Sequence, residues 1–161
     1  MTTYDIFTRV SNAQDIAGET SVVSVNSVPL SVGSGPGGAA VLRDIGVGEP
    51  VAFRCHVTTA FSAGETLTVE VIIASDAALT SSITAIGATA AITTANLTAG
   101  TEFDVPVPPL TQAYLAANGK AYMGLRYLLS GALAASAISA WIPLGQSPGV
   151  PRRYAGNYTG P

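Results

Sequence analysis

The chain has 161 residues, of which 48% are hydrophobic and 11% charged, and its formal net charge is −3. This length predicts one domain with a sizeable core, and the low charge indicates a surface of small polar side chains or one covered by partners. Residues 1–104 hold all ten acidic and three basic residues, whereas 105–161 hold four basic residues and no acidic one. Nucleic-acid binding is not expected, because it needs Lys and Arg clustered on a broad face.

The start of the chain lacks the basic and apolar regions of a signal peptide. The sequence contains no uninterrupted apolar run of about 18 residues, so no membrane span is expected. Cys55 is the only cysteine, so an internal disulfide is impossible and folding in a reducing compartment is expected. We therefore expect a protein that is made in a cytoplasm and has no membrane partner.

The predicted elements begin with a polar segment, residues 1–20, which we interpret as an N-terminal arm that packs on a partner. Residues 21–32 are expected to form one interrupted strand or two short ones, and Pro29 favours an edge position there. The glycine-rich stretch 33–38 is a predicted loop.

Period-two alternation of apolar and polar side chains predicts the longer strands of the next part of the chain. Between them, residues 75–82 and 114–119 are expected to form short helical turns. The strands predicted in this region are 51–57, 66–73, 83–88 and 103–107.

Alternation is clearest in residues 121–144, which predict two strands joined by a connection of small residues. Met123, Leu125 and Tyr127 share one face of the first of these strands, as a half-buried sheet requires. Residues 145–161 are rich in proline and glycine and are expected to form a C-terminal arm.

About eight strands, with no amphipathic helix longer than about two turns, predict an all-β fold. We expect an antiparallel β-sandwich or jelly roll over residues 21–144, with extended terminal arms at 1–20 and 145–161. The missing long helical patterns argue against parallel β-α-β units.

Few groups in the chain could carry out catalysis. Cys55 and His56 are adjacent, so on a strand they point to opposite faces and cannot act as a pair. Cys55 is expected in the core, and His56 at the solvent or an interface. The stretch 33–38 matches a Gly-x-Gly-x-x-Gly pattern, but its proline and the strand that follows argue against a dinucleotide site. We expect no enzyme activity, no catalytic residue, no cofactor and no metal.

Two carboxylate pairs could in principle perform acid–base chemistry or bind calcium. These are Glu65 with Glu70, and Glu102 with Asp104. The second pair would share one strand face and repel without a compensating group, and we expect solvated edge charges. Trp141 and the six tyrosines could line a sugar-binding surface, although we expect them to be core or interface anchors. A carbohydrate-binding or adhesin-like sandwich is therefore the alternative function.

Side chains of the terminal segments are expected to bind the partner or a second copy of the chain. Aromatic residues in arms that cannot form a core of their own are natural anchors on another protein. For the C-terminal arginines, a solvated tail is the alternative interpretation. The expected partner-binding residues are Tyr4, Phe7, Arg9, Arg152, Arg153, Tyr154 and Tyr158.

Three blocks together resemble the jelly-roll capsid cement, or decoration, proteins of tailed bacteriophages. In residues 43–57, Arg-Asp-Ile-Gly-Val-Gly-Glu-Pro leads into a strand; residues 66–76 are a strand that ends in Ser-Asp; and 121–144 end in Ala-Trp-Ile-Pro-Leu. The resemblance covers about residues 5–144 and leaves 145–161 outside.

The resemblance implies a structural virion protein, made in the host cytoplasm, that binds the outer surface of the phage head. There it would stabilise contacts between major capsid proteins. The expected partners are the major capsid protein and further copies of the chain in a homo-oligomer, for which a dimer is favoured over a trimer.

Overall fold

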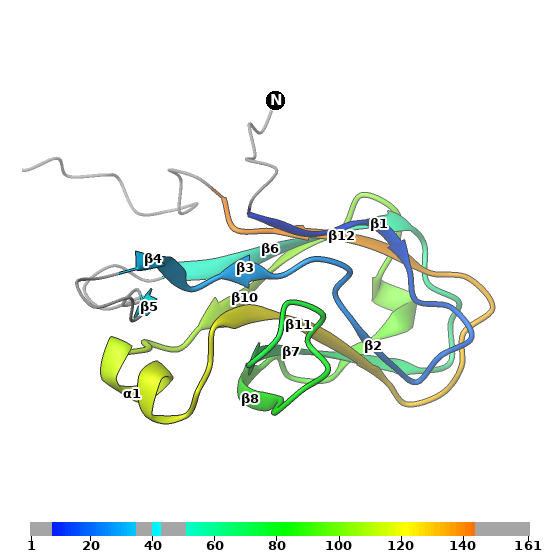
Figure 1. Cartoon of the computed structure of the whole chain (residues 1–161). Helices are drawn as coiled ribbons and strands as arrows, with labels where there is room; N and C mark the ends of the chain where they lie inside the picture. Colours follow the sequence, from blue (N-terminus) through cyan, green and yellow to red (C-terminus); the bar gives the residue numbers. More distant parts are fainter. Residues whose placement is uncertain (1–7, 35–39, 43–50, 144–161) are drawn as a thin grey trace, which may run out of the picture.

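The computed structural model describes residues 8–34, 40–42 and 51–143. These residues form two antiparallel β-sheets packed face to face, with loops at both ends (Figure 1). The all-β sandwich expected from the alternation of side chains is therefore confirmed.

The four-stranded sheet has the order β1-β12-β6-β10, and the six-stranded sheet is built around the order β2-β11-β7-β8. In addition, β3 pairs with β11, β9 pairs with β7, and β4 and β5 form a small sheet of their own. The strands are β1 (Arg9–Asp15), β2 (Ser21–Val23), β3 (Val28–Pro29), β4 (Ser31–Ser34), β5 (Ala40–Leu42), β6 (Val51–Thr59), β7 (Thr66–Ala74), β8 (Thr84–Ala88), β9 (Ile92–Thr93), β10 (Glu102–Val107), β11 (Tyr122–Leu129) and β12 (Ala137–Trp141). The helical segments are η1 (Thr94–Asn96) and α1 (Gln112–Ala117).

The strand order is that of a jelly roll. The pairs are nested along the chain: β1 pairs with β12, β2 and β3 pair with β11, and β6 pairs with β10. The innermost pair is β7 with β8, and the chain reverses its direction between these two strands. Such nesting places neighbours in sequence in opposite sheets and closes the two sheets around one core.

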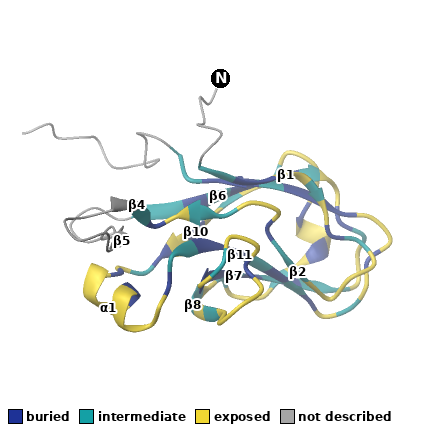
Figure 2. Ribbon diagram, in the orientation of Figure 1, coloured by how far each residue is buried: buried dark blue, intermediate teal, exposed yellow. Residues whose placement is uncertain are grey.

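The core consists of the inward-facing side chains of both sheets. Alternate residues of β7 and β11 are fully buried, as the period-two pattern predicts, and β6 and β10 contribute the facing layer. Figure 2 shows this buried interior between the sheets and the exposed loops around it. Cys55 belongs to this core and is 0% exposed, as expected.

The N-terminal part of the sandwich differs from the expectation. Residues 9–15, which the sequence places in an arm, form β1 and pair with β12. The register shifts twice in this pair, and both Val10 and Ser11 are buried. These bulges break the alternation that identifies a strand, which is why the sequence pattern does not show it.

Two connections also differ from the expectation. Residues 75–82 contain no helical turn; instead they form a loop of turns and bends. The helix expected at 114–119 lies slightly earlier, as α1, where the Thr111 hydroxyl accepts a hydrogen bond from the backbone N–H of Tyr114 and caps the N-terminus.

Candidate functional site

The outer face of the six-stranded sheet is covered by the loop of residues 75–82. Leu79 on this loop is 0% exposed and packs with Ile72 and Ala74 in a second, small apolar cluster. A Cβ atom added to Gly124 of β11 would lie 2.3 Å from Leu79 Cδ1, so Leu79 lies directly against the glycine backbone. The part of this face around Ile72, Ala74 and Gly124 is therefore occupied by the protein's own chain.

The loop owes its shape to a single carboxylate. Asp76 accepts hydrogen bonds from the backbone N–H of Ser81 at 2.6 Å and from the backbone N–H and hydroxyl of Thr80. These bonds, led by the one from Ser81, lower the pKa of Asp76. The ammonium of the buried Lys120 donates to the carbonyl oxygen of Ser82 and holds the far end of the loop.

The edges of both sheets carry features that hinder pairing with another strand. β1 contains two register shifts, β8 contains one, and β10 contains Pro106. Between β1 and β2, the side-chain amide of Gln14 donates to the carbonyl of Val23 and accepts from the N–H of Val25. Association by adding strands edge to edge is therefore disfavoured.

The outer face of the four-stranded sheet carries most of the charge of this sheet. One row crosses all four strands in register: Arg9 of β1 lies opposite Trp141 of β12, Trp141 opposite Arg54 of β6, and Arg54 opposite Asp104 of β10. The neighbouring row runs from Ser139 through His56 to Glu102. We call these two rows the charged face; its members are Arg9, Trp141, Arg54, Asp104, Ser139, His56 and Glu102.

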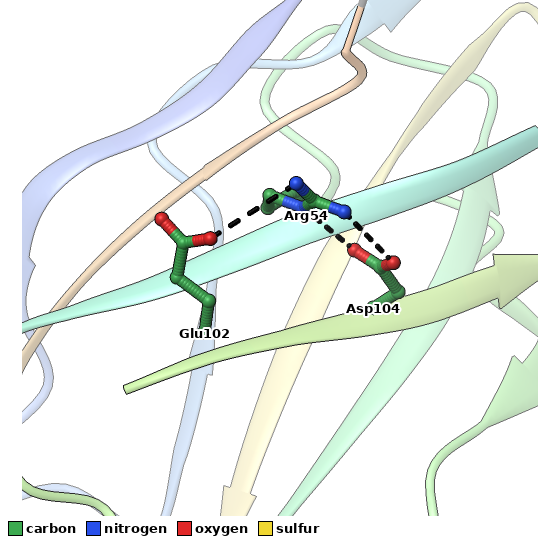
Figure 3. A network of polar contacts seen from close by, with 3 residues as sticks. All are labelled: Arg54, Glu102 and Asp104. Atoms are coloured by element: carbon green, nitrogen blue, oxygen red, sulfur yellow. Dashed lines mark hydrogen bonds and ion pairs between the residues drawn. The ribbon is translucent and has the colours of Figure 1, made fainter. Parts of the chain in front are cut away.

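Arg54 lies at the centre of an ion-pair network on the charged face (Figure 3). Its Nε and Nη2 donate to the two carboxylate oxygens of Asp104 at 2.9 and 3.1 Å, and its Nη1 lies 4.0 Å from Glu102 Oε2. The hydrogen bond to Asp104 raises the pKa of Arg54. Arg54 is thus the compensating group for Glu102 and Asp104, which share one face as expected.

The opposite outer face holds one comparable pair. Arg126 of β11 donates from Nε to Glu70 Oε2 of β7 at 2.7 Å, and Nη2 lies 2.6 Å from the same oxygen. Arg126 and Glu70 lie directly opposite each other on neighbouring strands, and both side chains are half-buried. Glu70 is therefore held by Arg126 and is not a solvated charge, whereas Glu65, the other carboxylate of the candidate pair, accepts a hydrogen bond from the Ser130 hydroxyl.

A buried polar network ties the two sheets together. Ser11 donates from Oγ to Gln14 Oε1 at 2.8 Å, so its single hydroxyl hydrogen is used there. The hydroxyl of Tyr127, 2.8 Å from Ser11 Oγ, is then the donor of that second bond. Burial raises the pKa of both Tyr127 and the Cys55 thiol, so neither group ionises readily.

Of the expected partner-binding residues, Arg9 is the one that the structure describes. It is half-buried on the charged face and donates to Asn12 Oδ1 at 3.0 Å. The six others, Tyr4, Phe7, Arg152, Arg153, Tyr154 and Tyr158, lie outside the described residues.

The two terminal segments are attached side by side. The N–H of Ile142 donates to the carbonyl of Thr8 at 3.1 Å, next to the paired Arg9 and Trp141. Figure 1 shows β1 and β12 next to each other where the chain enters and leaves the sandwich. The described chain thus begins at Thr8 and ends just after Ile142 at neighbouring positions beside the charged face.

The sequence did not predict two residues with a structural role on the outer faces: Arg54 in the ion-pair network and Lys120 beside the loop 75–82. Arg54 was part of a recognised strand, but its pairing with β10 depends on the register of strands about 50 residues apart, which alternation alone does not give. Lys120 follows Gly119, and nothing in the local pattern connects it to the loop that it holds.

Trp141, the expected sugar-stacking residue, faces outward from β12 but is only 6% exposed. An aromatic ring that stacks on a sugar needs an accessible face. Within residues 8–34, 40–42 and 51–143, no group of three or more His, Cys, Asp or Glu side chains is placed to hold a metal ion. Neither helical segment in this part of the chain has the length and apolar character needed to cross a membrane.

In residues 8–34, 40–42 and 51–143 the strands are nested, the core between the sheets is apolar, and the ion pairs of Arg54 and Arg126 lie on the outer faces. These features define a jelly-roll sandwich. Its sequence matches the family described as Bbp16 over residues 10–142, which is most of the chain, and the protein belongs to that family. A search of curated proteins finds no match.

Proposed function

We propose that this protein is a structural component of a phage virion that binds the outer surface of the head and stabilises contacts between major capsid proteins. In this proposal it is made in the host cytoplasm, acts as a homo-oligomer and catalyses no reaction. Its fold and its resemblance to capsid cement proteins support the proposal, as does its membership of the Bbp16 family.

The observation that carries the proposal is the adjacent attachment of the two terminal segments. Both are attached to the paired strands β1 and β12 of a domain with an apolar core. The segments contain the aromatic residues Tyr4, Phe7, Tyr154 and Tyr158. One domain can therefore present several anchors to a large surface from one place, and symmetry on a shell multiplies weak contacts.

Deletion of residues 145–161 tests this division of labour. We expect the shortened chain to keep its fold and to lose most of its binding to empty heads in co-sedimentation. A matched variant, Tyr154→Ala with Tyr158→Ala, should lose part of the binding if the aromatic side chains are the anchors. Full binding by the shortened chain would contradict the proposal that this segment attaches the protein.

The carbohydrate-binding alternative gains no support from Trp141, because this side chain is only 6% exposed. Glycan-array binding that is lost on Trp141→Ala would nevertheless favour it over the capsid role. Binding to heads that added sugars do not alter would favour the capsid role.

A further inference from the structure

The two outer faces of the sandwich differ in what they offer a partner. The loop 75–82 lies over the six-stranded sheet and buries Leu79 there. The charged face of the four-stranded sheet presents half-buried Arg54, His56 and Ser139 and the more exposed Glu102 and Asp104. The charged face is therefore the better candidate for a broad protein contact.

Charge on this face is distributed asymmetrically from edge to edge. Arg9 lies on β1, at one edge of the sheet, while Glu102 and Asp104 lie on β10, at the other. Four strands at the usual spacing put these edges about 14 Å apart. The formal charges of Arg9, Arg54, Glu102 and Asp104 cancel, so the two rows of the charged face are neutral, with Arg9 at one edge and the two carboxylates at the other. Asp15, at the far end of β1, lies outside these rows.

We propose that the charged face is the interface between two copies of this chain, related by a two-fold axis that runs parallel to the strands. This inference rests on the proposed function in one respect, since it assigns a surface to the homo-oligomer. Such an axis turns one sheet over onto the other and reverses the order of the strands. β1 of each copy then faces β10 of the other, and Arg9 of each copy meets Asp104 and Glu102 of the second.

A two-fold axis of a face-to-face pair lies in the plane between the sheets, and of its two limiting orientations, along or across the strands, the charges favour the one along the strands. An axis running across the strands would place β10 on β10, and the carboxylates of Glu102 and Asp104 would repel their own copies. In a two-fold interface every contact occurs twice, so a favourable or unfavourable pair counts double. Only the axis along the strands puts opposite charges together at both edges.

The size of the face predicts a reversible contact. A four-stranded sheet about 19 Å wide, with strands up to about 30 Å long, offers roughly 550 Å² per copy. A total near 1,100 Å² falls at the lower end of specific interfaces. We expect a dimer that forms in the micromolar range, weakens as salt screens the charges, and is reinforced when many copies bind one shell.

Sedimentation equilibrium of the full chain tests the proposal, with three variants. Arg9→Asp and Asp104→Arg should each raise the dimer Kd about 10-fold or more, because each reversal acts at two places. Arg9→Asp leaves the pair of Arg54 with Asp104 intact, so its effect reports the interface. The double variant Arg9→Asp with Asp104→Arg reverses both edges and should restore the Kd to within about 3-fold.

Glu19→Arg is the matched control for Asp104→Arg, because it makes the same change of charge at an exposed position in the loop between β1 and β2. It should leave the Kd unchanged, and thermal melts of all variants establish that they are folded. A chain that stays monomeric at about 200 µM, or single variants that the double variant does not rescue, would overturn the proposal. A tighter dimer in Asp104→Arg would contradict the contact of Arg9 with Asp104 and would also overturn the proposal. All these measurements use isolated protein, so loss of head binding by a chain that still dimerises would contradict the proposed function alone.

Discussion

At the scale of single residues, Gly124 shows how one missing side chain lets a loop close on a sheet. Gly124 is buried on β11, and a Cβ atom there would lie 2.3 Å from Leu79 Cδ1 and 2.7 Å from Ser24 Oγ. Leu79 itself has a φ of 57°, in the left-handed region that is unfavourable for leucine. The apolar contact with Ile72 and Ala74 holds it in this conformation.

Gly124→Ala should therefore lower the free energy of unfolding by about 1 to 3 kcal/mol, because the added methyl group overpacks the site. Urea denaturation measures the loss. In Gly124→Ala with Leu79→Ala the contact with Leu79 disappears and only the one with Ser24 Oγ remains, so the combined loss should be smaller than the sum of the two single losses. Gly87→Ala, whose Cβ would lie 3.0 Å from Pro108 Cγ, is a milder control. An unchanged midpoint in Gly124→Ala would contradict the packing described for Leu79.

At the scale of elements, the loop 75–82 is a segment without regular structure that is nonetheless fixed. Asp76 binds the backbone at Ser81 and Thr80, and Ser27 Oγ donates to the carbonyl of Ala77 at 2.8 Å. Such side-chain bonds to the backbone compete with a helix for the same groups. The expected helical turn is absent here for this reason.

The stability that Asp76 gives to the loop 75–82 should decrease at low pH. Because the pKa of Asp76 is lowered on folding, its carboxylate contributes stability above its ordinary pKa of 3.8, and this contribution is lost as the pH falls through the folded-state pKa. Asp76→Ala should lower the unfolding midpoint at pH 7, and its difference from the natural chain should shrink towards pH 2.

Amide hydrogen exchange at Thr80 and Ser81 gives the local signal, since protection there should fall in Asp76→Ala at pH 7. Glu19→Ala, in an exposed loop, should leave both readouts unchanged. A difference in midpoint between Asp76→Ala and the natural chain that stays constant from pH 7 to pH 2 would show that the charge of Asp76 is not the cause.

The sequence predicts those elements whose side chains alternate without interruption. β6, β7, β10 and β11 lie within a residue or two of their expected bounds. The sequence pattern does not predict β1, because its bulges put Val10 and Ser11 on the same side. It does not predict β9 either, because this strand is too short to show a period. Local pattern identifies a regular strand and misses an irregular one.

The candidate site is harder to predict than the strands. Alternation places Glu102 and Asp104 on one face and separates Cys55 from His56, and both results agree with the structure. It does not say that β6 lies between β10 and β12, so the row from Arg9 to Asp104 depends on strand order, which is set by packing of the whole chain.

At the scale of the whole molecule, the jelly roll is one cooperative unit around a single main core. Cys55 lies in the middle of that core, 0% exposed, on a strand with neighbours on both sides. Its pKa is raised by burial, so the reactive thiolate is scarce as well as inaccessible.

Labelling of Cys55 by a thiol reagent should therefore require global unfolding. In native buffer the reaction should be slow, and its rate should rise with urea in parallel with the unfolding rate measured by tryptophan fluorescence. The chain has no other cysteine, so the signal is unambiguous. Rapid labelling of the native protein would contradict a single closed core.

The pairing of β1 with β12 also has a consequence for biosynthesis. β1 is made early, yet its strand partner in the sheet lies more than a hundred residues later. At ordinary speeds of translation, the ribosome needs roughly 10 s to produce the intervening chain. During that interval Val10 and Ile16, which are buried in the finished domain, have no completed sheet to cover them. A nascent chain interrupted before β12 would consequently expose apolar surface and be a substrate for chaperones or proteases.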